Sequence, residues 1–133
     1  MEKKTIGTSK APAAIGAYSQ AVVIGDMIFT AGQIGLEPDT GALAGPGISS
    51  QTKQVLQNLE AVLAEAGASF ADVVKTTIYI KHLEDFPTVN EIYAQHFTSN
   101  FPARSTVQVA GLPLGALVEM DMVAHVTDGR VSF

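Results

Sequence analysis

The sequence predicts an α+β fold, a mixed β-sheet with two helices packed on one face. Residues 48 to 66 and residues 85 to 97 carry apolar side chains at helical spacing, every three or four positions. The segments before, between and after them have the two-residue alternation of β-strands, so the element order is β-β-α-β-α-β-β. Right-handed crossovers would bring both helices to the same face of the sheet. The other face then needs a cover, which a second copy of the chain could supply.

Residues 21 to 30 read as two β-rich runs around Gly25 and Asp26, a pair suited to a two-residue hairpin turn with Gly at its first central position. Residues 37 to 47 are rich in Gly, Pro and Asp, which predicts a loop. A helix with one apolar face follows, and Gly67 is expected to end it as a C-cap. Its apolar face would carry Ile48, Thr52, Val55, Leu59, Val62, Leu63 and Ala66.

The second half of the chain repeats this alternation of strand and helix. The next predicted strand would carry Val74, Thr76, Ile78 and Ile80 on one side. A second helix is expected to begin near Asp85 with Pro87 in its first turn. Its apolar face would carry Val89, Ile92, Tyr93, His96 and Phe97. Two further strands are expected over residues 103 to 109 and 117 to 126, separated by a turn-rich stretch.

Length and composition limit the classes of protein. At 133 residues the chain fits one domain of ordinary size, which we expect to span residues 1–133. The apolar content of 47% is high for a monomer and favours a homo-oligomer. No apolar run approaches the ~20 residues that cross a bilayer, so no membrane partner is expected. The formal net charge of −5 argues against a nucleic-acid partner, whose phosphates bind clustered Lys and Arg.

The start of the chain and its cysteine content predict a location. The basic first residues are not followed by an apolar segment, so a secretory signal is not expected. Cysteine is absent, which excludes disulfides and a thiol nucleophile and fits a reducing compartment. We therefore expect a cytoplasmic protein.

Arg104 is the most informative charged residue, because Val107 and Val109 nearby suggest a buried strand. A buried guanidinium needs a planar anionic partner, which could be a protein carboxylate, a bound ligand or both. The two-residue alternation groups Arg104 with Thr106 and Gln108, and it sends Glu119 away from the apolar side of its own strand. Arg104 and Glu119 can therefore both point to the helix-free face.

Two arrangements of these strands stay open at this stage. A symmetric hairpin about Gly111 and Leu112 would put Arg104 and Glu119 nearly opposite each other, whereas an inserted strand would separate them. The pair could accordingly be a structural ion pair or part of one ligand site. The apolar side of the last strand belongs to the core. That side carries Val118, Met120, Met122, Ala124 and Val126.

The remaining conspicuous residues predict no cofactor chemistry. His82, His96 and His125 lack the spacing of metal ligands, so we expect no metal and no other cofactor. Tyr18 could cap a sheet edge or line a pocket.

Four ordered blocks give the chain a specific resemblance that spans nearly its whole length. The blocks are "APAAIGAYSQAV", "IFTAGQIG", "DVVKTTIYIKHLEDFPTVNEIY" and "FPARSTVQVAGLP". In order and spacing they resemble the Rid family, the YjgF-like enamine/imine deaminases, and within it the subgroup of reactive-intermediate deaminase A. The resemblance implies a chorismate-mutase-like α+β fold, a homotrimer, and ligand sites in the clefts between subunits.

The resemblance also implies roles for individual residues. Arg104 would hold the substrate carboxylate through two charge-assisted hydrogen bonds, and Glu119 would hold or activate the water. The residues that would shape the pocket are Tyr18, Gly32 and Asn90.

The chain departs from the family pattern at three positions. Thr106 stands where many active relatives have cysteine, which is not the family's nucleophile, so Thr106 can still offer its backbone N–H to the substrate. Gly111 replaces an arginine of the best-known bacterial members, which would change the rim of the site. Ala31 replaces a serine of some members, so a hydroxyl contact would be lost.

The resemblance predicts a cofactor-free hydrolase that converts short 2-imino and enamino acids, such as 2-aminoacrylate and 2-iminobutyrate, to 2-oxo acids and ammonia. Its partners would be this small molecule and further copies of the chain. Two alternatives are a non-catalytic module that senses 2-oxo acids and an RNA-cleaving inhibitor of translation. A sensor would use Arg104 equally but tolerate loss of Glu119.

Overall fold

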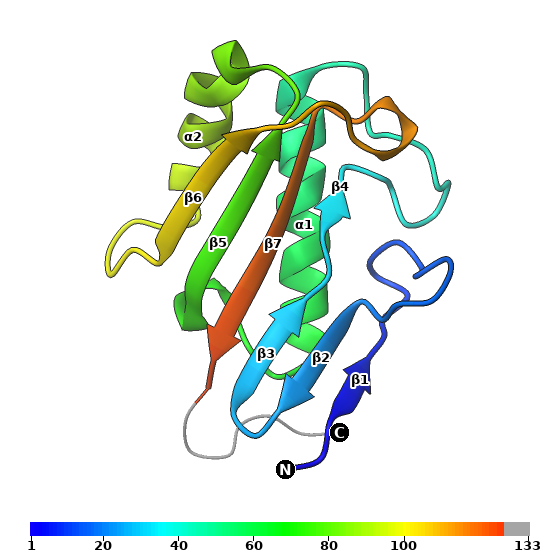
Figure 1. Cartoon of the computed structure of the whole chain (residues 1–133), viewed down its shortest axis with the longest axis vertical. Helices are drawn as coiled ribbons and strands as arrows, with labels where there is room; N and C mark the ends of the chain where they lie inside the picture. The colour runs from blue at the N-terminus through cyan, green and yellow to red at the C-terminus, as the bar shows by residue number, and fades with distance from the viewer. Residues whose placement is uncertain (127–133) are drawn as a thin grey trace.

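A computed structural model of the protein describes residues 1–126 (Figure 1). Its seven strands form one mixed sheet in the order β1-β2-β3-β7-β5-β6, and β4 pairs with β7. Pairing is parallel only between β5 and β6 within this sheet. The strands are β1 (Lys4–Ile6), β2 (Ala21–Ile24), β3 (Met27–Thr30), β4 (Gln33–Ile34), β5 (Val73–Ile80), β6 (Ala103–Gln108) and β7 (Val118–His125).

Two α-helices lie on one face of the sheet, behind it in Figure 1. The helices are α1 (Ile48–Glu65) and α2 (Phe86–Ala94), and short 3-10 helices occupy η1 (Phe70–Asp72), η2 (Leu83–Asp85) and η3 (Pro113–Gly115). The predicted mixed α+β fold is confirmed, and the short strands β1 and β4 are additions to it. The last seven positions of the domain expected over residues 1–133 lie outside the described residues. Within residues 1–126 no helix is long and apolar enough to cross a membrane.

The predicted hairpin joins β2 to β3 through a two-residue turn. Ile24 pairs with Met27, and Gly25 between them has a φ of 58°. A positive φ at the first central position is what this turn requires, and glycine adopts it without steric cost.

The helix α1 buries its apolar face and ends as the sequence predicts. Val55, Leu59 and Leu63 are fully buried against the sheet. After the helix, the Gly67 N–H donates to the Ala64 carbonyl and the Ala68 N–H donates to the Leu63 carbonyl. Gly67 has a φ of 83°, so it provides the left-handed residue of a Schellman C-cap.

The strand β7 has the predicted two-residue alternation. Its buried side lies under the helices and is at most 1% exposed at Val118, Met120, Met122, Ala124 and Val126. The opposite side, which includes Glu119, is only partly covered. This face is where a second subunit could lie.

One prediction for β5 is wrong. Val74 was expected on the same side as Thr76, Ile78 and Ile80; these three are fully buried, but Val74 is 45% exposed. The register between β5 and β7 shifts between Val73 and Lys75, so Val73 takes the buried position instead. A bulge of this kind adds one residue to a strand and reverses the alternation before it.

The helix α2 also ends earlier than its apolar spacing predicts. It begins after Asp85 with Pro87 in its first turn, as expected, but it ends at Ala94. His96 lies beyond the helix and is exposed, so its predicted place on the apolar face is wrong. Phe97 is still buried, because its ring stacks on Tyr93 with centroids 4.4 Å apart.

Candidate functional site

Arg104 lies on β6 at the edge of the sheet, and its side chain rests against α2. The guanidinium carbon is 5.2 Å from the ring centroid of Phe86 and 5.1 Å from that of Tyr93. Its Nη1 donates a 2.7 Å hydrogen bond to Oδ1 of Asn90. Two aromatic rings and one amide therefore fix the orientation of an arginine that is exposed to solvent.

The predicted burial of Arg104 is wrong within one chain. β6 pairs with β5 alone, so it is an edge strand. Val107, which suggested a buried strand, is 42% exposed. The guanidinium has no carboxylate partner among residues 1–126, so most of its N–H donors are free to bind an anion.

A pocket of about 430 Å³ opens beside this guanidinium, and we call it the Arg104 pocket. Its walls are largely aromatic and apolar, with one amide and one cation. They consist of Asn90, Tyr93, Ala94, Phe97, Phe101, Pro102 and Arg104. A planar cation in such surroundings is suited to a small carboxylate, which the guanidinium can meet with two parallel hydrogen bonds.

Glu119 lies on β7 and points to the helix-free face of the sheet. Burial raises the pKa of its carboxyl above the ordinary value, and the nearby negative charge of Asp121 raises this pKa further. Gly32 lies directly against the carboxylate, since a Cβ placed at this glycine would be 2.8 Å from Cδ of Glu119. A residue without a side chain is therefore needed at position 32 for Glu119 to lie where it does.

Glu119 lines a second cavity of about 260 Å³, which we call the Glu119 pocket. It combines one carboxylate with walls that are mostly apolar. They consist of Pro12, Ala13, Ile15, Tyr18, Gly32, Gln33, Ile34, Leu36, Pro113, Leu114 and Glu119. Tyr18 is 54% exposed, so its ring is a wall of the pocket and not a cap buried on the sheet edge.

The two pockets lie apart because β5 is inserted between β6 and β7. Arg104 pairs with Thr76 of β5, whereas Glu119 pairs with Tyr79. Two strand spacings and three residues of offset put the two backbone positions about 14 Å apart. The symmetric hairpin about Gly111 and Leu112 is therefore wrong, and the inserted strand is right.

Arg104 and Glu119 also point to opposite faces, which corrects the expectation that both face away from the helices. Thr76 is buried under the helices and accepts a hydrogen bond from the Tyr93 hydroxyl at 2.9 Å. Residues paired across a sheet share a face, so Arg104 points to the helix side, beyond the part that the helices cover. A structural ion pair between Arg104 and Glu119 of one chain is excluded by this arrangement.

The predicted site residues divide between the two pockets. Asn90 joins Arg104, and Tyr18 and Gly32 join Glu119. Thr106 is half-buried on β6 and pairs with Ile78, and it lines neither pocket.

Sequence reasoning missed two sets of neighbours. The sequence places Tyr93 only on the apolar face of the second helix and assigns no role to Phe86, although the spacing of the two rings could also have suggested a platform for a cation. Asp121 follows Glu119 by two positions, so the strand alternation already put both on one face. Its carboxylate accepts a 2.9 Å hydrogen bond from the Tyr79 hydroxyl.

Histidines do not contribute to either pocket. His125 contacts Asp26 at 2.9 Å, and His82 lies 4.0 Å from Glu84. In the part of the chain that the structure describes, no group of three or more His, Cys, Asp or Glu side chains could hold a metal ion. The chemistry offered by the two pockets is thus that of one cation and one carboxylate of raised pKa.

Known proteins resemble this chain over nearly its whole length. Human 2-iminobutanoate/2-iminopropanoate deaminase is 49% identical over 122 residues, which are 92% of this chain and 89% of that protein. The chloroplastic Reactive Intermediate Deaminase A of Arabidopsis thaliana is 48% identical over 124 residues, 93% of this chain and 66% of that protein.

Solved structures agree with this similarity. The YjgF gene product of E. coli superposes with a TM-score of 0.88 at 46% identity, covering 92% of this chain and 98% of that one. E. coli TdcF with bound serine gives a TM-score of 0.89 at 41% identity, covering 93% and 99%. The family model described as Endoribonuclease L-PSP matches residues 8–126. The chain therefore belongs to this family, the Rid or YjgF-like family that its four sequence blocks resemble.

Proposed function

We propose that the protein is a 2-iminobutanoate/2-iminopropanoate deaminase, a cofactor-free hydrolase that converts short 2-imino acids to 2-oxo acids and ammonia. Curated relatives that carry this name are 49% and 50% identical to the chain over 92% of its length. The observation that carries the proposal is the exposed Arg104 guanidinium, held on two rings with free N–H donors. A 2-imino acid presents the carboxylate that such a group binds. Because the chain lacks cysteine, a cytoplasmic role in removing reactive imines suits it.

The proposed assembly is a homotrimer in which the Arg104 pocket of one subunit faces the Glu119 pocket of the next. Two observations support it. The two groups that the reaction needs lie on opposite faces of one sheet, and their backbone positions are about 14 Å apart. The helix-free face also exposes large apolar side chains, with Phe29 45% and Val107 42% exposed. Association would bury them and complete the site from two chains.

In this mechanism Arg104 binds the substrate carboxylate and thereby fixes the position of C2. An enamine first tautomerises to the imine. As a water oxygen bonds to C2 of the protonated imine, Glu119 takes a proton from the water and the C=N electron pair becomes the nitrogen lone pair. Glu119 returns this proton to the nitrogen. The C–N bond then breaks, and the hydroxyl proton leaves with ammonia as ammonium while the C=O bond of the 2-oxo acid forms.

The raised pKa of Glu119 suits this double duty. A carboxyl whose pKa lies nearer to neutral accepts and returns a proton more readily than one at its ordinary value. General acid–base assistance of this type adds about 10²–10⁴-fold to a rate.

The other site residues support these two groups. We propose that Asn90 orients the guanidinium, that Gly32 admits the carboxylate and that Tyr18 covers the bound substrate. Thr106 contributes its backbone N–H at the subunit interface. These roles follow from the family resemblance and fit the contacts of Asn90, Gly32 and Tyr18 described above.

The direct test generates 2-iminobutyrate in the cuvette with an amino-acid oxidase and follows its disappearance with and without the protein. We expect faster hydrolysis and stoichiometric release of 2-oxobutanoate and ammonia. A protein that binds 2-oxobutanoate without accelerating hydrolysis would be the sensing module instead. In that case Glu119→Gln would leave ligand binding intact, whereas Arg104→Ala would abolish it.

A further inference from the structure

The segment of residues 109–117 connects β6 to β7 and forms one wall of the Glu119 pocket through Pro113 and Leu114. Its backbone is unusual at two consecutive positions. Leu114 has a φ of 57° and Gly115 a φ of 70°. A leucine in the left-handed region keeps that conformation only when its surroundings hold it there. Leu114 is 70% exposed, so its own side chain supplies little of this restraint.

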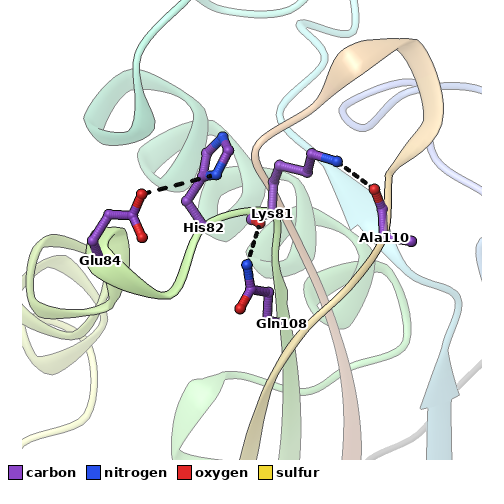
Figure 2. A network of polar contacts seen from close by, with 5 residues as sticks. All are labelled: Lys81, His82, Glu84, Gln108 and Ala110. Atoms are coloured by element: carbon purple, nitrogen blue, oxygen red, sulfur yellow. Dashed lines mark hydrogen bonds and ion pairs between the residues drawn. The ribbon is translucent and has the colours of Figure 1, made fainter.

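Lys81 holds both ends of this segment. Its ammonium group donates to the carbonyl of Ala110 near the start (Figure 2). Its backbone N–H donates to the carbonyl of Leu117 at the end, at 3.0 Å. Figure 2 also shows the Gln108 amide, which donates to the Lys81 carbonyl at 3.1 Å. One residue at the end of β5 therefore fixes the distance between the two ends of the wall.

Gln51 of α1 holds the same wall from inside the protein. It is only 1% exposed, and its Oε1 accepts a 2.8 Å hydrogen bond from the Leu117 N–H. Its Nε2 donates a 2.9 Å hydrogen bond to the carbonyl of Gly45. Both backbone polar groups of Leu117 are therefore hydrogen-bonded, the N–H to Gln51 and the carbonyl to Lys81.

The backbone of α1 at Gln51 is itself pressed against the strand that carries the opposite wall. A Cβ at Gly35 would lie 2.7 Å from the Gln51 carbonyl oxygen, so only glycine permits this approach. Ile34 and Leu36, the neighbours of Gly35, line the Glu119 pocket. Gln51 thus contacts both walls of the Glu119 pocket, one through its side chain and the other through its backbone, and so fixes their positions relative to α1.

We propose that Gln51 and Lys81 are positioning residues of the deaminase, which fix the 109–117 segment and thereby the distance of Leu114 from Glu119. The proposal rests on the proposed function of the Glu119 pocket. Neither residue lines the Arg104 pocket or the Glu119 pocket, so each would act through the wall that it holds. A correctly held wall keeps the substrate C2 in line with the water at Glu119 and limits the size of the substrate side chain.

The test compares Gln51→Met, which removes both amide hydrogen bonds at similar volume, with Lys81→Met, which removes the ammonium donor. Lys81→Arg is the conservative control, because it keeps a donor that can reach Ala110. Thr52→Val is the matched control for Gln51. Thr52 is its equally buried neighbour on α1, and its hydroxyl has no hydrogen-bond partner within residues 1–126.

Two measurements are made on the intact assembly, at one temperature well below the unfolding midpoint of the least stable variant, so that loss of fold is not measured. The first is amide hydrogen exchange over residues 109–117. The second is kcat and KM for the imines of alanine and leucine. We expect faster exchange in Gln51→Met and Lys81→Met, and about tenfold lower kcat/KM for the smaller imine. The ratio of kcat/KM for the leucine imine to that for the alanine imine should rise about threefold.

Lys81→Arg and Thr52→Val should retain wild-type exchange and selectivity. Unchanged exchange in both methionine variants would overturn the proposal, and so would faster exchange with unchanged selectivity. If the wild-type protein hydrolyses neither imine, the proposed function fails on its own. Calorimetric binding of pyruvate and 4-methyl-2-oxopentanoate, the 2-oxo acids of alanine and leucine, then replaces turnover, and the ratio of their affinities decides whether the wall is positioned by these residues.

Discussion

The hydroxyl of Tyr79 donates a 2.9 Å hydrogen bond to Asp121, which lies two residues after Glu119 on the same face of β7. The bond holds the negative charge of Asp121 near the Glu119 carboxyl, whose ionisation burial already disfavours. Asp121 is the second cause, after burial, of the raised pKa of Glu119. Asp121 therefore lines neither pocket, but it raises the pKa of a carboxyl that lines one.

Asp121→Asn should lower the pKa of Glu119, because it removes the neighbouring charge and leaves the burial unchanged. If turnover needs the ionised Glu119, the acid limb of the kcat/KM profile should move to lower pH. The pH dependence of the free energy of unfolding should change as well, because it depends on the same pKa. A raised folded-state pKa means that stability present below about pH 4.5 is lost as the pH rises through that pKa, and Asp121→Asn should reduce this loss. Tyr79→Phe keeps the charge of Asp121, so a shift of equal size and direction in that variant would contradict the explanation.

Arg104→Ala should abolish turnover and 2-oxo acid binding while leaving the unfolding midpoint nearly unchanged. Its guanidinium is exposed, and its contacts are one amide and two rings. Two charge-assisted hydrogen bonds to a carboxylate are worth about 3 kcal/mol or more, so binding should weaken by at least roughly 100-fold. Arg104→Lys keeps the charge but not the planar fork and should also lose most activity. Calorimetry with 2-oxobutanoate measures the binding, and wild-type affinity in Arg104→Ala would reject the assignment.

The division of the site between subunits can be tested by mixing two inactive variants. Arg104→Ala and Glu119→Gln are co-expressed in equal amounts, and all the trimers that form are purified together. If each site takes Arg104 from one chain and Glu119 from the next, about one site in four has both groups intact. The mixture should therefore recover about a quarter of wild-type activity per site. If both groups come from the same chain, every site lacks one of them and the mixture stays inactive.

Gly32→Ala should lower turnover without unfolding the protein. The added methyl group would meet the Glu119 carboxylate and displace it. The backbone at Gly32 is exposed and is not in the left-handed region, so alanine can be placed there without backbone strain. Misplacing a catalytic group by about 1 Å can cost about 100-fold in rate. Gly47→Ala is the control, because a methyl group there meets no atom within 4 Å. Equal kcat/KM in the two variants would show that Glu119 does not need its observed position.

Thr52→Val should stabilise the fold. The Thr52 hydroxyl is fully buried and has no hydrogen-bond partner in the described part of the chain, so its desolvation is uncompensated. Replacing it by a methyl group of the same shape should raise the free energy of unfolding by about 1 kcal/mol. Urea unfolding at neutral pH measures this, and a decrease would mean that the hydroxyl has a partner in the assembled protein.

The local pattern was sufficient for both helices, for strands β2, β3, β5, β6 and β7, and for the side-chain groupings within β6 and β7. It grouped Arg104 with Thr106 and separated both from Ser105, as the pairing with β5 confirms. It could not say which face each group occupies. That depends on a parallel pairing between β5 and β6, whose partners lie about thirty residues apart, and on the exact register of that pairing.

The other differences between prediction and structure have separate causes. The bulge at Val74 changes the alternation by one residue, and no glycine marks it in the sequence. The strand β4 has only two residues, too few for a periodic signal. The polar Gln51 and Asn58 are buried because they bond to loop backbone, a role that depends on distant segments coming together.

The position of Arg104 on an edge strand affects solubility as well as binding. An open strand edge invites pairing with other chains, and a charged side chain discourages this. β6 reads ARSTVQ, so Arg104 is its sole charge. In an unassembled chain this cation would discourage such pairing. Arg104→Ala would thus leave a neutral, β-prone edge and should aggregate more readily than Arg104→Lys, although both lose the substrate fork.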